Sequence, residues 1–355
     1  MKIPPALEPF LEDIESRIDA DAEDALIAQW KMFWNGEIKA PFFAPQRKPV
    51  PAKIQWPVTS VTDAINDPTF ELMLLSQLET VNSILSGTNG SLFSIRPNYG
   101  TTIIPSLFGA EVVLMERSLN TLPCARPFPG GGDGIRQLIG QGIPSCRSGQ
   151  GGAVLDCTHF YLEILQHFPL LEKYCRVYHP DLQGPMDICE VVWGNDVFFA
   201  FYDEADLIHQ FMKLIVDTYT VFIDDWFKLV PAEKDFNVHR GWIHPGKIRL
   251  SLDSCMNLSP ENYKEFVKPY DSALLERYGG IIHSCGKVDH FVPLLADLKG
   301  YCAFNPAQPV YNDMEIIYQA TIDKKIPLLN LSRAAADDAV ARGRNLHGLA
   351  HVFTV

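Results

Sequence analysis

The sequence has no long apolar run and no surplus of positive charge. No stretch approaches the about 18 apolar residues of a membrane-spanning helix, and the longest apolar segment, 191–202, is interrupted by Asn195 and Asp196. The formal net charge of −13 disfavours binding to nucleic-acid phosphates or anionic lipid. The acidic start also lacks the features of a signal peptide. We therefore expect a cytoplasmic protein with neither nucleic acid nor membrane as a partner.

Paired cysteines and a nucleotide-binding fingerprint are also missing. The eight cysteines are scattered singly, without any C-x-x-C pair, and are expected to be free thiols that mostly lie in the core. The Gly- and Pro-rich segment 123–152 does not follow a strand with the glycine spacing of a dinucleotide site. It is predicted to be a long loop. His239, in another turn-rich stretch, is expected to be exposed.

The order of predicted elements indicates an α/β fold. A helix over 6–19, an extended arm over 36–60 and a helix from Asp67-Pro68 are expected before residue 89. Strands and helices then alternate, and no strand is expected to pair with the next through a hairpin, which implies a parallel sheet. We predict one domain, 1–355, with N-terminal helices and an arm over 1–88 and a closed (β/α)8 TIM barrel over 89–355.

In such a barrel the catalytic residues lie at the carboxyl ends of the strands. This rule selects a set of polar residues that are expected to converge on one mouth: Arg96, Asn98, His179, Asp181, Gln183, Asp253, Cys255, His283, Cys285, Asn305, Gln308, Asn330, Ser332 and Arg333.

The sharpest signal in this set is His283-Ser284-Cys285-Gly286. Residues i and i+2 of a strand point to the same side, so the imidazole of His283 and the thiol of Cys285 are expected to project together. Both are suitable ligands for Zn²⁺, and one rigid strand would hold half of a tetrahedral site. The alternative is a hydrogen-bonded core histidine beside a small buried thiol.

Several segments resemble the uroporphyrinogen decarboxylase superfamily. They are QGPMD (183–187), YDE (202–204), LDSCMNLSPE (252–261), FVKPY (266–270), IIHSCG (281–286) and NPAQP (305–309). The resemblance covers about residues 90–333 and is most specific over 180–310. It implies a (β/α)8 barrel.

The resemblance is nearer to the cobalamin-dependent methyltransferases of the superfamily than to its decarboxylases. In those enzymes a His-x-Cys pair and a later cysteine hold zinc, which activates a thiol such as coenzyme M. His283 and Cys285 match that pair. Residues 1–60 lack the arginine-rich motif of the decarboxylases. Cys302 comes too early to match the later cysteine, which leaves His347, His351 and Cys255 as candidates for the third ligand.

Two of the other strand-end residues, Asp253 and Arg96, can each be interpreted in two ways. Asp253 is expected to support catalysis by orienting His283 or binding a substrate cation, or else to cap the following turn. Arg96 suits a carboxylate or sulfonate, but a surface ion pair is the alternative. The expected substrate-binding residues are Arg96, Asn98, His179, Asp181, Gln183 and Gln308.

The leading hypothesis is zinc-dependent methyl transfer between a corrinoid and a thiol or another small substrate. A metal-independent decarboxylase of a porphyrinogen or small carboxylic acid is the first alternative. A non-catalytic barrel that binds a tetrapyrrole or corrinoid is the second. The sequence leaves a corrinoid protein and a homodimer open as partners.

Overall fold

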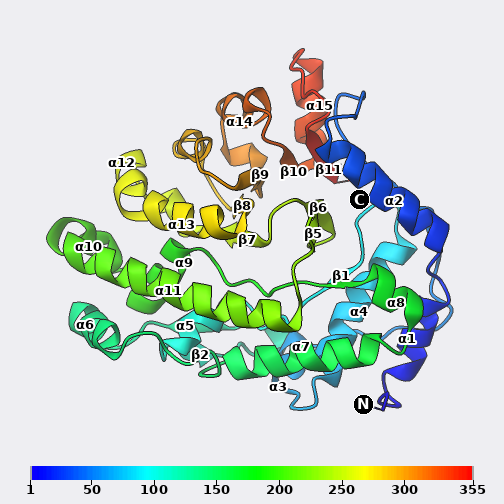
Figure 1. Ribbon diagram of the computed structural model, residues 1–355, viewed down its shortest axis with the longest axis horizontal. Coiled ribbons are helices and arrows are strands. Elements are labelled where there is room, and N and C mark those ends of the chain that lie inside the picture. The colour runs from blue at the N-terminus through cyan, green and yellow to red at the C-terminus, as the bar shows by residue number, and fades with distance from the viewer. Residues whose placement is uncertain (1, 354–355) are drawn as a thin grey trace.

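A five-stranded parallel sheet forms the centre of the computed structural model, which describes residues 2–353 (Figure 1). Its strand order is β11-β10-β9-β8-β7. The bounds of these strands are β7 Ile248–Ser251, β8 Gly280–Ser284, β9 Tyr301–Pro306, β10 Leu328–Ser332 and β11 Ala350–Phe353. Because all neighbours are parallel, their carboxyl ends lie along one edge.

Helices connect these strands in the order expected of βα units. β7 and β8 are connected by the one-turn 3-10 helix η2 Ser254–Asn257, α12 Pro260–Asn262, the π-helical turn η3 Tyr263–Val267 and α13 Lys268–Tyr278. The later connections contain the 3-10 helix η4 Val292–Leu295 between β8 and β9, then η5 Pro309–Tyr311, α14 Met314–Ala320 and η6 Ile322–Lys324 before β10, and α15 Arg333–Ala341 before β11. The strands are buried on both faces, as in β7, where all four residues are buried. Sheets covered on both faces are typical of α/β proteins. The parallel pairing of all five strands confirms the predicted parallel sheet.

Three further strand pairs lie outside this sheet. Strands β1 (Ser94–Ile95) and β4 (Arg176–Val177) are parallel, whereas β2 (Glu111–Val113) pairs antiparallel with β3 (Cys124–Arg126). The prediction that no strand pairs with the next through a hairpin turn was wrong, because the third pair is a hairpin.

The third pair is a tight β-hairpin between β5 (Asn237–His239) and β6 (Trp242–His244). Its two turn residues, Arg240 and Gly241, have φ of 52° and 79°. Positive φ at both positions is the mark of a type I′ turn, which matches the twist of the flanking strands. A glycine is needed at Gly241 because an added Cβ would lie 2.9 Å from the Leu92 carbonyl oxygen.

The first third contains more helix than predicted. It holds α1 Glu8–Glu15, α2 Ala20–Trp34, α3 Val61–Asn66 and α4 Glu71–Ser86. The arm over 36–60 is extended as expected, with only isolated bridges. Asp67 does not begin a helix. Its carboxylate accepts the backbone N–H groups of Thr69 and Leu72, so it supports the start of α4 from a turn upstream.

Helices also fill the middle of the chain. They are α5 Ile103–Leu107, α6 Gly131–Gln141, α7 Gly151–Leu165, α8 Pro169–Tyr174, α9 Pro185–Trp193, α10 Val197–Asp203 and α11 Ala205–Leu229. The prediction of a long loop over 123–152 was wrong, because β3 and α6 lie inside it. Helix α6 forms despite its glycines because Ile135 and Leu138 are buried in the main core.

Backbone hydrogen bonds continue from both edges of the central sheet. Phe43, in the arm, pairs with β11 through its N–H and C=O groups. At the other edge, Gly184 donates to the Ser251 carbonyl. The β1–β4 pair is not part of the same ladder as β7, so one closed ring of eight strands is not established.

Over the described residues 2–353, no helix is long and apolar enough to span a bilayer.

Candidate metal centre

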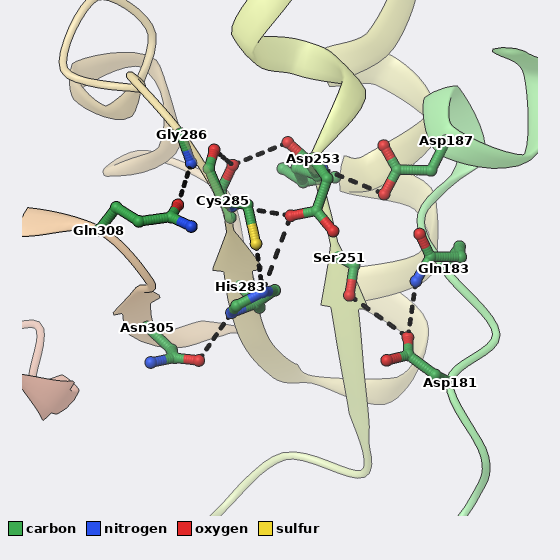
Figure 2. Close-up of polar contacts among 12 residues, drawn as sticks. Asp181, Gln183, Asp187, Ser251, Asp253, His283, Cys285, Gly286, Asn305 and Gln308 are labelled. Carbon is green, nitrogen blue, oxygen red and sulfur yellow. Dashed lines mark hydrogen bonds and ion pairs between the residues drawn. The ribbon is translucent and has the colours of Figure 1, made fainter. Parts of the chain in front are cut away.

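The ends of β7 and β8 bring three expected site residues together (Figure 2). Ser251 of β7 pairs with His283 of β8, and the Leu252 N–H donates to the His283 carbonyl. Asp253 therefore leaves β7 at the level at which Cys285 leaves β8. Parallel neighbours in register place residues from two distant segments at one point.

The side chains of Asp253, His283 and Cys285 form a compact donor set. The Cys285 Sγ lies 3.4 Å from the His283 Nε2, and the Asp253 Oδ1 lies 3.7 Å from the same nitrogen. Within residues 2–353 this is the only group of three or more His, Cys, Asp or Glu residues whose ligand atoms lie within 4.8 Å of one another. The side-by-side placement expected for His283 and Cys285 is thus observed.

A hydrogen-bond chain sets the protonation of His283. The Asn305 Nδ2 donates to the Leu329 carbonyl at 2.9 Å, which turns its Oδ1 toward the His283 Nδ1 at 2.7 Å. Because Oδ1 only accepts, Nδ1 carries the proton. In the neutral ring, Nε2 then presents a lone pair toward Cys285 and Asp253. This is the tautomer that metal-binding histidines use, with the second nitrogen held by a polar partner.

Asp253 is positioned from both sides. Its Oδ1 accepts the Cys285 backbone N–H at 2.7 Å, and its own N–H donates to Asp187 in the first turn of α9 at 3.1 Å. Asp187 also accepts the Ser254 N–H at 2.7 Å. Burial, followed by the nearby Asp253 charge, raises the pKa of Asp187 well above its usual range. Asp187 thus anchors the turn that carries Asp253.

The two softer ligands are neutral in the metal-free protein. Burial and then Arg249 lower the pKa of His283 to about 4. Burial and then Asp253 raise the pKa of the Cys285 thiol to about 12. Near pH 7 the centre therefore holds a neutral imidazole and a protonated thiol, and the thiol has to lose its proton to bind a metal.

The backbone turns sharply after Cys285. Gly286 has φ of 79°, and a Cβ there would lie 2.6 Å from the Met256 sulfur. Its N–H donates to Oε1 of Gln308. Gln308 therefore braces the loop that carries the thiol.

A second polar layer surrounds Asp181. Its carboxylate lies 3.4 Å from the guanidinium nitrogens of both Arg96 and Arg249 and accepts from Gln183 at 2.8 Å. Arg96 also donates to Asn98 at 3.1 Å. Burial alone would raise the pKa of Asp181, but the two arginines outweigh it and hold the pKa well below its usual range. The ion pair at Arg96 is buried, not a surface contact.

His179 is committed to the backbone. Its Nδ1 donates to the Pro180 carbonyl at 2.7 Å, and its Nε2 accepts the Arg249 N–H at 3.2 Å. Both ring nitrogens are thus bonded to the backbone, and His179 shapes the chain in this structure. The expectation for His239 was wrong as well. It is 3% exposed, and its Nδ1 lies 2.6 Å from the His244 Nε2.

The three candidates for a later metal ligand lie elsewhere. His347 is exposed. The His351 Nδ1 accepts the Asn330 N–H, and its ring centroid lies 4.7 Å from that of Trp30. Cys255 is buried among apolar residues of the core. The structure places Asp253, and none of these three residues, in the group with His283 and Cys285.

Sequence reasoning missed three residues of this region. Arg249 holds Asp181, Arg240 is at the turn of the β5–β6 hairpin, and Asp187 anchors Asp253. Arg249 and Ser251 alternate with the apolar Ile248 and Leu250 along β7, so a signal for Arg249 was present.

No protein-family model and no curated protein matches the chain. Among solved structures, a methyltransferase from Methanosarcina mazei is similar, with a TM-score of 0.59 over 93% of each chain and 15% sequence identity. At that identity the likeness shows the fold alone. The chain therefore has a mixed α/β fold that is also found in a methyltransferase.

Proposed function

We propose that this protein is a zinc-dependent methyltransferase in which Asp253, His283 and Cys285 hold the metal. The observation that carries the proposal is the convergence of one imidazole nitrogen, one thiol sulfur and one carboxylate oxygen at the carboxyl ends of two parallel strands. Three protein ligands with one open position are typical of catalytic zinc, whereas structural zinc has four.

The donor set fits zinc. With Zn–N of about 2.0–2.1 Å and Zn–S of about 2.3 Å, a tetrahedral site needs an N···S separation of about 3.5 Å and an N···O separation of about 3.4 Å. The observed separations are 3.4 Å and 3.7 Å. Metal-binding histidines also donate their second ring N–H to a polar partner. His283 does so to Asn305, which leaves the lone pair of Nε2 free for a metal.

The residues divide the work of such a reaction. A bound zinc ion would lower the pKa of a substrate thiol and keep its sulfur nucleophilic at neutral pH. Asn305 holds the His283 ring, and Asp187 and the Cys285 N–H hold Asp253. These contacts fix the three donor atoms before the substrate binds, which limits reorganisation during the reaction.

Membership of the uroporphyrinogen decarboxylase superfamily and a corrinoid methyl donor are part of the same proposal. The motif resemblance over 180–310 and the fold likeness to a methyltransferase support them. The pairing of Phe43 with β11 and the contact of Gly184 with β7 support an eight-stranded barrel in which further segments continue both edges of the sheet.

Methyl transfer is tested with methylcobalamin as donor and coenzyme M as acceptor. We expect the zinc-loaded protein to demethylate the cobalamin, which is followed by absorbance, and His283→Ala to lower the rate at least about 100-fold, because it removes a ligand and not only a supporting contact. The matched control is His159→Ala on the surface of α7, which should leave the rate unchanged. An equal rate in chelator-treated protein would contradict the proposal.

Zinc binding should release one proton. Near pH 7 the Cys285 thiol is protonated and His283 is already neutral, as their pKa values of about 12 and about 4 require. Only Cys285 then loses a proton, so zinc affinity should rise about tenfold per pH unit between pH 6 and 8. Calorimetry in buffers of different ionisation enthalpy measures the proton count. Release of no proton would exclude Cys285 as a ligand.

Decarboxylation is the second candidate. It is favoured by one observation, the buried arginines at Asp181, since carboxylate substrates need such groups. It needs no metal. Release of carbon dioxide from uroporphyrinogen by chelator-treated protein would support it over methyl transfer.

A further inference from the structure

Arg249 and Ser251 are alternate residues of strand β7, and Ser251 pairs with His283 on β8. Residues two apart on a strand point to the same face, so Arg249 belongs to the face that ends at the metal centre. Its guanidinium contacts the Ser251 hydroxyl at 3.0 Å, and Ser251 is the ladder partner of His283. The guanidinium therefore lies near the level of His283. Asp253 and Cys285 follow one two-residue step further along, a distance of roughly 6–7 Å.

Positive charge is in excess at this level. Arg96 and Arg249 share one carboxylate, that of Asp181, so a cation is left over. The Arg249 side chain is only 5% exposed, and its Nε is buried without a hydrogen-bond partner. A buried N–H group without an acceptor is costly, and an anion would satisfy it.

Arg240 brings a third guanidinium toward the same place. The hairpin that carries it packs on the site face of the sheet, because Trp242 and Ile243 share an apolar cluster with Ile281, two residues before His283. The neighbouring His239 ring lies 4.4 Å from that of His179, whose Nε2 accepts the Arg249 N–H.

The Arg240 side chain lacks a partner of its own. It is reached by solvent and makes no hydrogen bond or ion pair to any residue of the described chain. Desolvation, and then the positive charges of Arg249 and Arg96, lower the pKa of Arg240, while the Asp181 carboxylate opposes them. This agrees with the placement of Arg240 beside His239, whose ring contacts that of His179. The adjacent histidines add no charge near pH 7, since burial lowers the pKa of His179 to about 4 and that of His244 to about 3.

We propose that Arg96, Arg240 and Arg249 form an anion-binding subsite for the oxyanion of a compact substrate whose reactive end lies at Asp253, His283 and Cys285. The anion is a carboxylate, phosphate or sulfonate, because three forked guanidinium groups match its oxygens. Because the Arg249 guanidinium lies within one two-residue step, roughly 6–7 Å, of the metal-binding side chains, the spacer is limited to a few bonds. This inference rests on the proposed function only for the reactive end of the substrate.

Arg240→Gln is the sharpest variant. It removes one charge and leaves both ion pairs of Asp181, with Arg96 and Arg249, in place. Glutamine faces the same positive φ as arginine, so the backbone strain is unchanged. Calorimetric titration of metal-free protein with inorganic phosphate at constant ionic strength should show one saturable site. We expect Kd to rise at least about tenfold in Arg240→Gln, as loss of a charge-assisted contact requires, and to recover in large part in Arg240→Lys.

Two controls locate the effect. Arg126→Gln removes an exposed arginine that pairs with Glu111 and should leave Kd unchanged, and His283→Ala should still bind phosphate. Phosphate that fails to saturate the wild type, or that binds Arg240→Gln as tightly as the wild type, would overturn the subsite. Because the titration needs neither zinc nor turnover, a failure of the proposed methyl transfer leaves this result standing, and the reverse also holds.

Discussion

Cys285→Ala should lose tight zinc binding. The thiolate is the only sulfur among the three donor atoms, and removal of supporting contacts alone lowers metal affinity by about 10–100-fold. Loss of the ligand itself should exceed about 100-fold. Competition with a chromogenic chelator measures the affinity of wild type and variant side by side.

Cys124→Ala is the matched control for this substitution. Cys124 is an exposed free thiol on β3, so its removal should leave zinc affinity within about twofold. If Cys285→Ala keeps the affinity of the wild type, the metal, if any, is bound elsewhere and the proposed function fails. If both variants lose affinity, zinc binds nonspecifically to thiols.

Asp181→Ala should destabilise the fold by about 3–5 kcal/mol. The substitution leaves Arg96 and Arg249 buried without their shared carboxylate, and uncompensated buried charge carries a penalty of this size. Urea unfolding followed by far-UV circular dichroism measures the change. The control Asp217→Ala breaks an exposed pair with Lys213 on α11 and should cost less than about 0.5 kcal/mol.

The ion pairs of Asp181 with Arg96 and Arg249 predict that the free energy of unfolding depends on pH. The pKa of Asp181 is depressed in the folded state, so its contribution is fully present above the unfolded value of about 3.9. It declines as the pH falls from there through the folded pKa. The stability difference between wild type and Asp181→Ala should therefore be constant from pH 5 to 7 and shrink below pH 4. A difference that grows in acid would contradict the assignment.

The parallel sheet and the pairing of His283 with Cys285 were predictable because they depend on local rules. Alternation along one strand places i and i+2 together, and the strand bounds follow from apolar runs that end in glycine or polar residues. The 3.4 Å separation of Sγ and Nε2 is the outcome. Because His283 and Cys285 lie within three residues of the chain, their proximity can be predicted without the tertiary fold.

Contacts between distant segments were harder to predict. Asp253 reaches the centre through the register of β7 and β8, and the resemblance to the methyltransferases pointed to the C-terminus instead. Arg240 and the buried His239 depend on a hairpin whose turn, Arg-Gly, lacks the usual Asn-Gly or Asp-Gly signal. Helix α6 begins with glycines and is held by packing of Ile135 and Leu138, which no local propensity reveals.

Zinc K-edge X-ray absorption of the zinc-loaded protein is the most direct test of the metal centre. The account predicts one sulfur at about 2.3 Å and nitrogen and oxygen ligands at about 2.0–2.2 Å, with the sulfur lost in Cys285→Ala and the imidazole scattering lost in His283→Ala. A coordination shell without sulfur, or one that is unchanged in both variants, would contradict it.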